Sequence, residues 1–366
     1  MSGLPPHETD LTRAHALPAH AYTDPALYAL ERERIFGRTW QPVGNAADVR
    51  HAGDFFTSDV AGEPIVVTRD AGGTLRAFYN VCRHRAGPVA EGKGSRHALQ
   101  CKYHGWTYDL DGKLRTTPEL GAAPDFDPAC NGLVRCAVEA FGPFIFVNLD
   151  ADAAPLAPSI PEMAQAAKDR GLDTMTSVGR REYEVACNWK VYVDNYLEGY
   201  HLPHVHPGLF RELDYNAYRV ETRDLHSSQI APIRPPDGTH DRKHPRQYRH
   251  AQQGDEALYF WAFPNWMLNI YPDNMSINIV VPLSIDRTLT IFEWFLVDRV
   301  TSDPRSETER AMAFSDGIQQ EDIEICEAVQ RGLRSRGYPS GGKLSSAREN
   351  GVHHFQGLVG KFLSRN

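Results

Sequence analysis

Two short loops, each with one cysteine and one histidine, constrain the fold of this 366-residue chain more than any other feature. Cys82 and His84 stand in the run Cys-Arg-His, and after sixteen intervening residues Cys101 and His104 stand in the run Cys-Lys-Tyr-His. Two thiolates and two imidazoles are enough ligands for a closed metal site. The two loops are therefore predicted to converge on one metal centre.

The distribution of the ligands distinguishes two kinds of centre. Zinc accepts two cysteines and two histidines, and so does a [2Fe-2S] cluster in which two histidines replace two cysteines on one iron, a Rieske cluster. Zinc fingers of this composition usually pair cysteine with cysteine, whereas here each loop supplies one cysteine and one histidine. One iron can then bind both sulfurs and the other both nitrogens. This arrangement favours a Rieske cluster, and a structural zinc is the alternative.

The chain around these loops reads as β structure. Short runs such as Leu75–Tyr79 and Phe144–Leu149, separated by turn residues, predict an all-β region over about 41–150. Alanine, aspartate and proline dominate 149–161, which makes this stretch the best candidate for a linker.

The part after the linker mixes helices and strands. Helical periodicity runs through 189–200 and 307–333, whereas 266–283 and 288–296 predict strands of a sheet. The predicted boundaries are 1–40 for an N-terminal helical segment packed on the second domain, 41–150 for the β domain and 151–366 for the second domain.

Composition and charge exclude several classes of partner. The 47 acidic and 39 basic residues give a formal charge of −8, the wrong sign for a chain that neutralises many phosphates, so we expect no nucleic-acid partner. No segment approaches 18 unbroken apolar residues, and the N-terminal stretch lacks the apolar core of a signal peptide, so we expect no membrane span. Six cysteines are too few for a disulfide scaffold in a chain of this length. A cytoplasmic protein is expected.

A second set of ligand-type residues lies in the mixed part. Asp194, Glu198 and His201 are spaced i, i+4 and i+7, which predicts that they share one face of a helix. Pro203 is expected to end that helix. Because His201 and His206 would diverge by about 140° on a continuous helix, the break is what lets both bind one ion.

A third ligand is sought among carboxylates on otherwise apolar helix faces. A lone carboxylate such as Asp322 is costly there unless it is paired or bound to a cation. With His201 and His206 it would complete the facial triad of a non-haem Fe(II) oxygenase, which leaves positions open for O₂ and substrate. His204 is the rival of His206, and a capping or salt-bridged Asp322 is the alternative. The rest of the apolar stripe is Ile318, Ile325, Cys326, Val329 and Leu333.

From about Tyr22 to Phe362 the chain resembles the α subunits of the Rieske non-haem iron aromatic-ring-hydroxylating oxygenases. In that family a Cys-x-His and a Cys-x-x-His pair bind the cluster, and a His-x-x-x-x-His pair with a later Asp binds the catalytic iron. The resemblance implies an α+β fold, with an N-terminal Rieske [2Fe-2S] β domain and a C-terminal helix-grip catalytic domain in which helices cover an antiparallel sheet. It also implies a homotrimer. The implied ligands are Cys82, His84, Cys101 and His104 for the cluster, and His201, His206 and Asp322 for the iron.

The resemblance further implies a link between the two centres. In this family a carboxylate three residues before the first iron-binding histidine bonds the second cluster histidine of a neighbouring subunit, so Glu198 would contact His104. Many ring dioxygenases have Asp at this position. The glutamate, together with the run Glu321–Leu333, makes the chain similar to the choline, carnitine and betaine branch. Asp194 is expected to orient the site without binding the iron.

The expected reaction is hydroxylation of an organic substrate by O₂ at Fe(II), with electrons supplied through the cluster. Because the chain has no Gly-x-Gly-x-x-Gly fingerprint on a strand-turn-helix and no second Cys₄ set, NAD(P)H and flavin are expected on a separate reductase, acting directly or through a ferredoxin. Electrons are expected to pass head to tail from cluster to iron between subunits.

Aromatic residues are dense in the predicted strands and leave the substrate class open. Ring faces attract a quaternary ammonium group, or stack on an aromatic substrate of a ring- or side-chain-hydroxylating enzyme. Most aromatics on such strands pack the core, so no single one is assigned. An electron carrier that uses only its cluster is the remaining alternative, which the length disfavours. The aromatic residues are Tyr259, Phe260, Trp261, Phe263, Trp266, Tyr271, Phe292, Trp294 and Phe295.

Overall fold

The computed structural model describes residues 3–172, 175, 177–234, 252–272, 274–296, 304–338 and 340–364. The chain divides into two compact units, and the first division falls within helix α2 (Pro25–Arg34). One unit comprises Arg32–Pro158 and a short segment that begins at Gly171, and the other comprises Met1–Glu31, Ser159–Arg170 and Met175–Asn366. None of the helices described is long and apolar enough to cross a bilayer.

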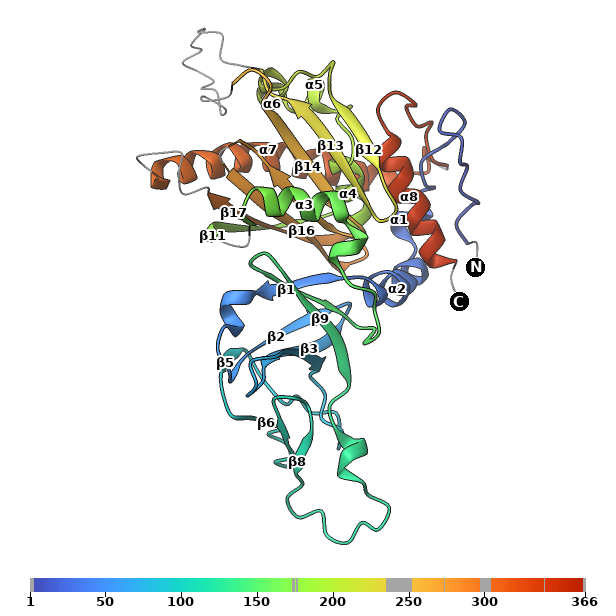
Figure 1. Ribbon diagram of the computed structural model, residues 1–366. Coiled ribbons are helices and arrows are strands. Elements are labelled where there is room, and N and C mark those ends of the chain that lie inside the picture. The colour runs from blue at the N-terminus through green and yellow to red at the C-terminus, as the bar shows by residue number, and fades with distance from the viewer. Residues whose placement is uncertain are drawn as a thin grey trace. The chain divides into compact units, whose positions relative to one another are not determined.

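The Arg32–Pro158 unit is built from antiparallel strands (Figure 1). Seven of the described strands form a sheet in the order β1-β10-β9-β4-β3-β2-β5, and a smaller sheet has the order β6-β7-β8. The β3–β4 and β7–β8 turns contain Gly73 and Gly112, whose φ angles of +80° and +88° suit a residue without a Cβ. The strands are β1 Gln41–Asn45, β2 Asp54–Val60, β3 Glu63–Arg69, β4 Leu75–Tyr79, β5 Lys93–Ser95, β6 Ala98–Gln100, β7 Thr107–Asp109, β8 Leu114–Thr116, β9 Arg135–Phe141 and β10 Phe144–Asn148. Short 3-10 turns lie at Phe36–Arg38, Ala46–Val49, Pro128–Asn131 and Ala157–Ser159.

Strand β3 lies between two hydrophobic layers. Ile65 and Val67 pack on one side with Val147, whereas Val66 packs on the other side with Phe55. Successive side chains of a strand alternate between faces, so burial on both faces explains the unbroken apolar run. The second layer also holds the cysteines of both ligand loops, which are thereby anchored in the core.

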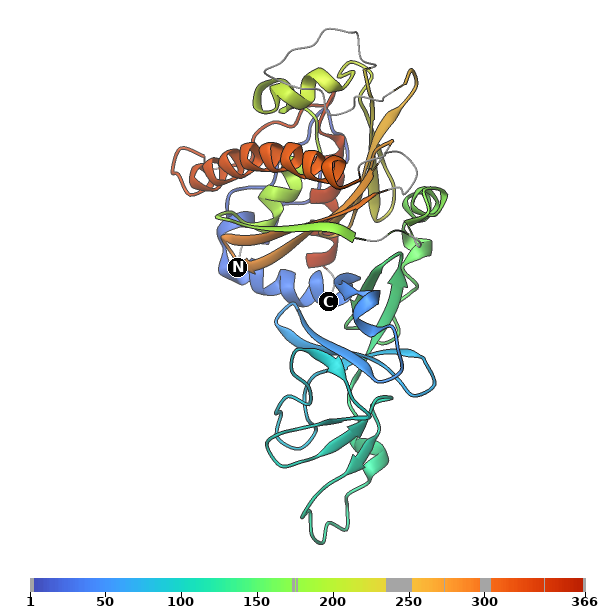
Figure 2. The ribbon, with the colours of Figure 1, turned by 90° about the vertical axis from the view of Figure 1, so that its left-hand side faces the viewer.

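The other unit contains a seven-stranded antiparallel sheet among the described strands, in the order β11-β17-β16-β15-β14-β13-β12. Figure 2 shows helix α7 along one face of this sheet, where α4 contacts both α7 and β16. Sheet and helices together confirm the predicted α+β class. The strands are β11 Ser177–Val185, β12 Arg219–Thr222, β13 His226–Pro232, β14 Glu256–Ala262, β15 Trp266–Ile270, β16 Asn274–Ser284 and β17 Arg287–Leu296. The helices are α1 His20–Thr23, α3 Pro161–Asp169, α4 Trp189–Tyr196, α5 Leu202–Val205, α6 Pro207–Glu212, α7 Pro304–Leu333 and α8 Asn350–Leu363.

Helix α4 ends earlier than predicted. Because it stops at Tyr196, the expectation that Asp194, Glu198 and His201 share one face of a helix is wrong. The Glu198 carboxylate accepts the backbone N–H groups of Tyr200 and His201. Such local bonds compete with continuation of the helix, which accounts for the turn at this point.

Pro203 does not end a helix either. It lies in the first turn of α5, where no N–H group is needed for an intrahelical bond. His201 precedes α5, and His206 stands between α5 and α6. The chain therefore leaves helical geometry on both sides of the short helix α5. These two interruptions allow His201 and His206 to approach the same point.

The apolar stripe on α7 is narrower than predicted. Cys326 and Leu333 are buried, but Ile325 and Val329 are 36% and 44% exposed. Asp322 keeps its position on this helix with a side chain that is 15% exposed.

Candidate metal centres and substrate cavity

The two cysteine-histidine loops share one backbone hydrogen-bond pattern. The Cys82 N–H donates to the carbonyl of Gly87 at 2.8 Å, and the Ala86 N–H donates to the carbonyl of Cys82 at 3.0 Å. Cys101 makes the same two bonds, each 2.9 Å, with the residues five and four positions later. In both loops the residue four positions after the cysteine has a positive φ, +59° at Ala86 and +72° at Gly105. Two equivalent turns thus present the two ligand pairs.

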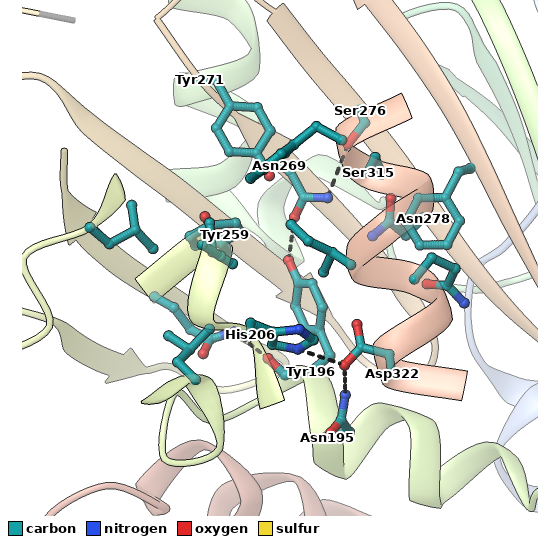
Figure 3. Close-up of a pocket in the computed structure, with 18 of the residues that line it drawn as sticks. Asn195, Tyr196, His206, Tyr259, Asn269, Tyr271, Ser276, Asn278, Ser315 and Asp322 are labelled. Atoms are coloured by element: carbon teal, nitrogen blue, oxygen red, sulfur yellow. Dashed lines mark hydrogen bonds and ion pairs between the residues drawn. The ribbon is translucent and has the colours of Figure 1, made fainter. Parts of the chain in front are cut away.

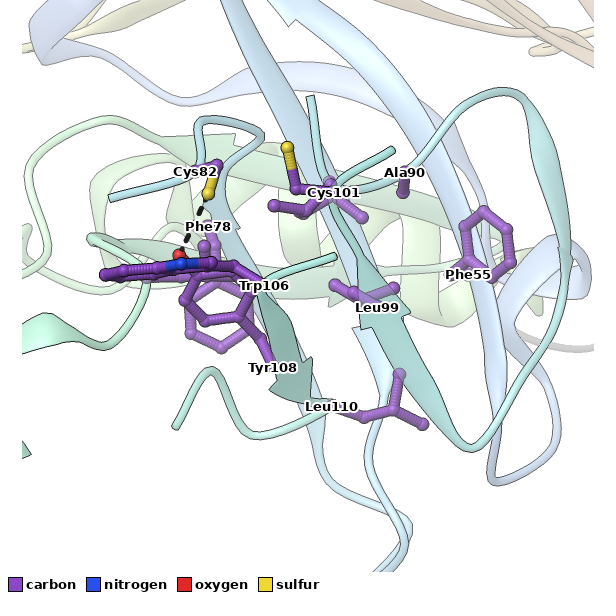
Figure 4. Close-up of a cluster of buried hydrophobic side chains, with 12 residues drawn as sticks. Phe55, Phe78, Cys82, Ala90, Leu99, Cys101, Trp106, Tyr108 and Leu110 are labelled. Atoms are coloured by element: carbon purple, nitrogen blue, oxygen red, sulfur yellow. Dashed lines mark hydrogen bonds between the residues drawn. The ribbon is translucent and has the colours of Figure 1, made fainter. Parts of the chain in front are cut away.

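The two loops place the cysteine sulfurs and the histidine rings in different environments. Cys82 and Cys101 are buried side by side (Figure 4), whereas His84 and His104 are exposed with ring centroids 4.6 Å apart. Burial, together with the neighbouring thiol, raises the pKa of Cys101, so two thiolates at this place need a cation. Paired sulfurs inside and paired imidazoles outside suit a cluster whose two irons differ in their ligands.

The surroundings of the cysteines also suit a cluster. The Tyr108 hydroxyl accepts the N–H of Arg83 at 2.9 Å and lies 3.2 Å from the Cys82 sulfur, to which it can donate. A Cβ on Gly87 would lie 2.9 Å from the Cys101 sulfur, so this glycine keeps space open. The ring of Trp106 stacks on His84 at 4.9 Å.

A second centre is formed by three side chains from separate segments. Ligand-type atoms of His201, His206 and Asp322 all lie within 4.8 Å of one another. Nε2 of His206 lies 3.0 Å from Oδ1 of Asp322 (Figure 3). Nε2 of His201 lies 3.9 Å from the same oxygen. Among the residues that the structure describes, this is the one group of at least three histidine, cysteine, aspartate or glutamate residues found close enough to hold one ion. Two imidazoles and one carboxylate fit the facial triad, and the exposed His204 lies outside it.

A carboxylate lies within hydrogen-bond distance of the other ring nitrogen of each histidine. Glu198 Oε1 lies 2.5 Å from Nδ1 of His201, and Glu321 Oε2 lies 2.6 Å from Nδ1 of His206. With Nδ1 engaged, the Nε2 atom of each ring is left to face Asp322. Metal-binding histidines usually have such a partner, so the arrangement fits the donor set.

Glu321 and Asn195 are not among the site residues predicted from the sequence. The Asn195 side-chain amide donates to Oδ1 of Asp322 at 2.6 Å. Glu321 could have been suspected because it directly precedes Asp322. Asn195 carries no comparable signal, since its role depends on how α4 meets α7.

Asp194 lies apart from this group. Its carboxylate accepts the Tyr22 hydroxyl at 2.6 Å and the Gln356 side-chain amide at 3.1 Å, and it does not line the cavity described below. Burial raises the pKa of Asp194 to about 7. Nearby, Lys190 and Glu31 form a buried ion pair at 2.5 Å. Asp194 therefore belongs to a polar network that joins the N-terminal segment, α4 and α8.

A cavity of about 140 Å³ adjoins this centre, and His201, His206 and Asp322 form part of its lining. Tyr196 donates to Asn269 at 2.6 Å, and Asn269 donates to Ser276 at 3.0 Å (Figure 3). Among the described lining residues the acidic ones are Glu198 and Asp322, and none is lysine or arginine. One row of directly paired strand residues on this wall is Gln229, Tyr259, Asn269, Ser276 and Trp294.

Four of the nine aromatic residues predicted from the strands line this cavity. They are Tyr259, Tyr271, Phe292 and Trp294. The alternation of side chains along a strand explains part of this difference between lining and non-lining residues. Phe295 points away from the face that carries Trp294. The five that do not line it are Phe260, Trp261, Phe263, Trp266 and Phe295.

Two protein-family models match the chain. Residues 39–127 match the Rieske [2Fe-2S] domain, and residues 172–365 match the ring hydroxylating alpha subunit (catalytic domain). Each match contains one of the two centres.

Full-length relatives agree with these matches. The chain is 34% identical over 364 residues to the chloroplastic choline monooxygenase of Arabidopsis thaliana, which covers 95% of this chain and 83% of the relative. It is 28% identical over 359 residues to the carnitine monooxygenase oxygenase subunit of Escherichia coli (strain K12), and this match covers 94% of this chain and 93% of the relative. A solved quaternary ammonium Rieske monooxygenase in complex with substrate L-carnitine is similar at a TM-score of 0.82 and 28% identity, with 100% of both chains covered.

Proposed function

This chain belongs to the α subunits of the Rieske non-haem iron oxygenases, in the branch of the choline and carnitine monooxygenases, and we propose that its substrate is a quaternary ammonium compound. It is an oxidoreductase that incorporates O₂, and its family uses a Rieske [2Fe-2S] cluster and a mononuclear iron.

The ligand assignment rests on the two convergent residue sets. Cys82, His84, Cys101 and His104 hold the cluster, and His201, His206 and Asp322 hold the iron. When bound, the cluster supplies single electrons and the iron supplies the site of O₂ activation. The second set carries the oxygenase assignment, because an electron carrier needs no facial triad.

The chain's own residues orient the reactants. Glu198 lies 2.5 Å from His201 Nδ1 and would also accept a hydrogen bond from His104 of a neighbouring subunit in the proposed head-to-tail homotrimer. Inter-subunit electron transfer in a solved quaternary ammonium Rieske monooxygenase supports this role. Insertion of one oxygen atom into a C–H bond consumes one O₂, two electrons and two protons and releases water. The electrons come from NAD(P)H through a separate flavin and iron-sulfur reductase, which acts directly or through a ferredoxin.

The cavity lining carries the substrate proposal. Tyr259, Tyr271, Phe292 and Trp294 offer ring faces to a cation. Glu198 adds negative charge beside the iron site, and no described lining residue is lysine or arginine. A neutral aromatic hydrocarbon would gain no comparable attraction from this charge. A quaternary ammonium group therefore suits this wall better than an aromatic ring.

Two measurements on anaerobically purified protein test the proposal. We expect about three irons and two acid-labile sulfides per chain, as one cluster and one mononuclear site require. With the reduced protein we expect O₂ consumption that depends on choline, carnitine or a related betaine. Zinc without sulfide would overturn the ligand assignment. Turnover of benzoate-like acids with none of the ammonium compounds would overturn the substrate class alone.

A further inference from the structure

The imidazole of His206 is held between two consecutive carboxylates of one helix. Its Nε2 lies 3.0 Å from Asp322 Oδ1, and its Nδ1 lies 2.6 Å from Glu321 Oε2. Consecutive side chains on a helix point about 100° apart, so α7 can reach both edges of the same ring. The His206 side chain is only 2% exposed. Each of its two ring nitrogens therefore lies beside a carboxylate oxygen of α7.

We propose that Glu321 is a positioning residue for the iron site. An ionised Glu321 accepts the Nδ1–H of His206, which fixes the tautomer whose Nε2 lone pair is free to bind metal. The negative charge also makes that nitrogen a stronger donor. The inference rests on the proposed metal ligation by His206 and Asp322.

The alternative is an ordinary surface ion pair that has no bearing on the metal. The Glu321 side chain is 42% exposed, as such a pair would be. However, a surface pair joins two solvated groups, whereas here one partner is a buried ring with one nitrogen at the metal centre. Removal of Glu321 would leave Nδ1 with no acceptor among its described contacts and would free the ring to adopt the other tautomer.

Glu321 differs from Glu198 in a way that makes it the cleaner site to alter. Glu198 lines the cavity and also accepts the N–H groups of Tyr200 and His201, so its replacement disturbs the loop. Glu321 does not line the cavity, and its described contact is with His206. A change at Glu321 should therefore alter the binding of metal and leave the binding of substrate unchanged.

The experiment is an anaerobic Fe(II) titration of protein whose mononuclear iron has been removed with a chelator while its cluster stays intact. Loss of a carboxylate behind a metal-binding histidine typically weakens metal binding about 10- to 100-fold, and we expect a loss in this range for Glu321→Ala. Glu321→Gln keeps an acceptor without the charge and should fall between Glu321→Ala and the unaltered protein. Glu324→Gln, an exposed position on the same helix, is the matched control and should bind Fe(II) as the unaltered protein does.

Two further readouts separate positioning from folding and from the proposed function. The visible spectrum of the cluster and the thermal unfolding midpoint should match in all variants, and the Co(II) absorption bands of fully loaded Glu321→Gln should shift because the donor strength of His206 has changed. Unchanged Fe(II) affinity and unchanged Co(II) bands in Glu321→Ala would overturn the inference. If Asp322→Ala also bound Fe(II) normally, the ligand assignment itself would fail. If only Asp322→Ala lost Fe(II), the inference about Glu321 alone would fail.

Discussion

The carboxyl of Asp194 is predicted to make the stability of the protein depend on pH. Burial raises its pKa to about 7 from an ordinary value of 3.8, although Tyr22 and Gln356 donate hydrogen bonds to it. A carboxyl with a raised pKa in the folded state favours folding while protonated, so its contribution is complete below about pH 4 and is lost as the pH rises toward 7. Between pH 5 and pH 8 this group should lower the free energy of unfolding by on the order of 2 kcal/mol.

Replacing Asp194 with asparagine removes this titration. We expect the difference in thermal unfolding midpoint between Asp194→Asn and the unaltered protein to move in favour of the variant as the pH is raised from 5 to 8. Asp169→Asn, at an exposed position on α3, is the control. A difference that stays constant over this pH range would contradict the assignment of the pH dependence to Asp194.

Gly87 is predicted to be necessary for full cluster loading. The Cβ of an alanine there would lie 2.9 Å from the Cys101 sulfur, which forces that sulfur to move at a cost of roughly 1–3 kcal/mol. Gly87→Ala should therefore contain less acid-labile sulfide per chain and absorb less visible light. Gly94→Ala is the matched control, because its Cβ would meet Phe55 at an ordinary 3.5 Å. Full sulfide content in Gly87→Ala would contradict the prediction, because it would mean that the loop can shift to accommodate the methyl group.

At the scale of the element, Asn188 is predicted to fix the start of helix α4. Its side-chain oxygen accepts the Lys190 N–H at 3.0 Å, its amide donates to the Ile285 carbonyl at 2.7 Å, and its backbone N–H donates to Gln330 at 2.9 Å. Asn188→Ala removes the cap and leaves a carbonyl unsatisfied, so the free energy of unfolding should fall by about 1–2 kcal/mol. Asn188→Ser keeps a capping oxygen and should lose less, as measured by denaturant unfolding followed by circular dichroism. Equal losses in both variants would contradict the capping role.

The ends of elements show what could be predicted from sequence. Strand β4 spans Leu75–Tyr79 as predicted, because turn residues mark its boundary before the strand and its apolar residues pack into the sheet. The end of α4 could not be predicted in the same way. It depends on the bonds that the Glu198 carboxylate makes with nearby backbone N–H groups, and these compete with a helical pattern that the sequence itself supports.

The candidate site shows the same division between chemistry and geometry. His201, His206 and Asp322 could be predicted to converge because their side chains are suitable metal ligands and because a lone carboxylate on that helix needed a partner. The wall of the cavity could not be predicted, since Ser276 faces Asn269 only through the register of β15 and β16. These two strands are consecutive, so their register depends on the short connection between them and on side-chain packing across the sheet, and the sequence of one strand does not encode it.

At the scale of the whole molecule, the central question is which cluster reduces which iron. The proposed homotrimer, with heterologous contacts, would close into a ring in which each subunit passes electrons from its cluster to one neighbour and receives them from the other. His84 and His104, two of the proposed cluster ligands, have exposed rings that are accessible for such a contact. Two inactive variants can separate transfer between subunits from transfer within one subunit.

The test uses mixed trimers of His104→Ala, which keeps the iron ligands, and Asp322→Ala, which keeps the cluster ligands. Different affinity tags on the two chains allow mixed trimers to be purified in tandem. Each mixed ring has one junction at which an intact cluster meets an intact iron site, so about a third of the unaltered turnover should return. Glu198→Gln added to the His104→Ala chain should remove most of this activity, whereas the same change in the Asp322→Ala chain should not. Mixed trimers as inactive as their parents would mean that electrons pass only within a subunit.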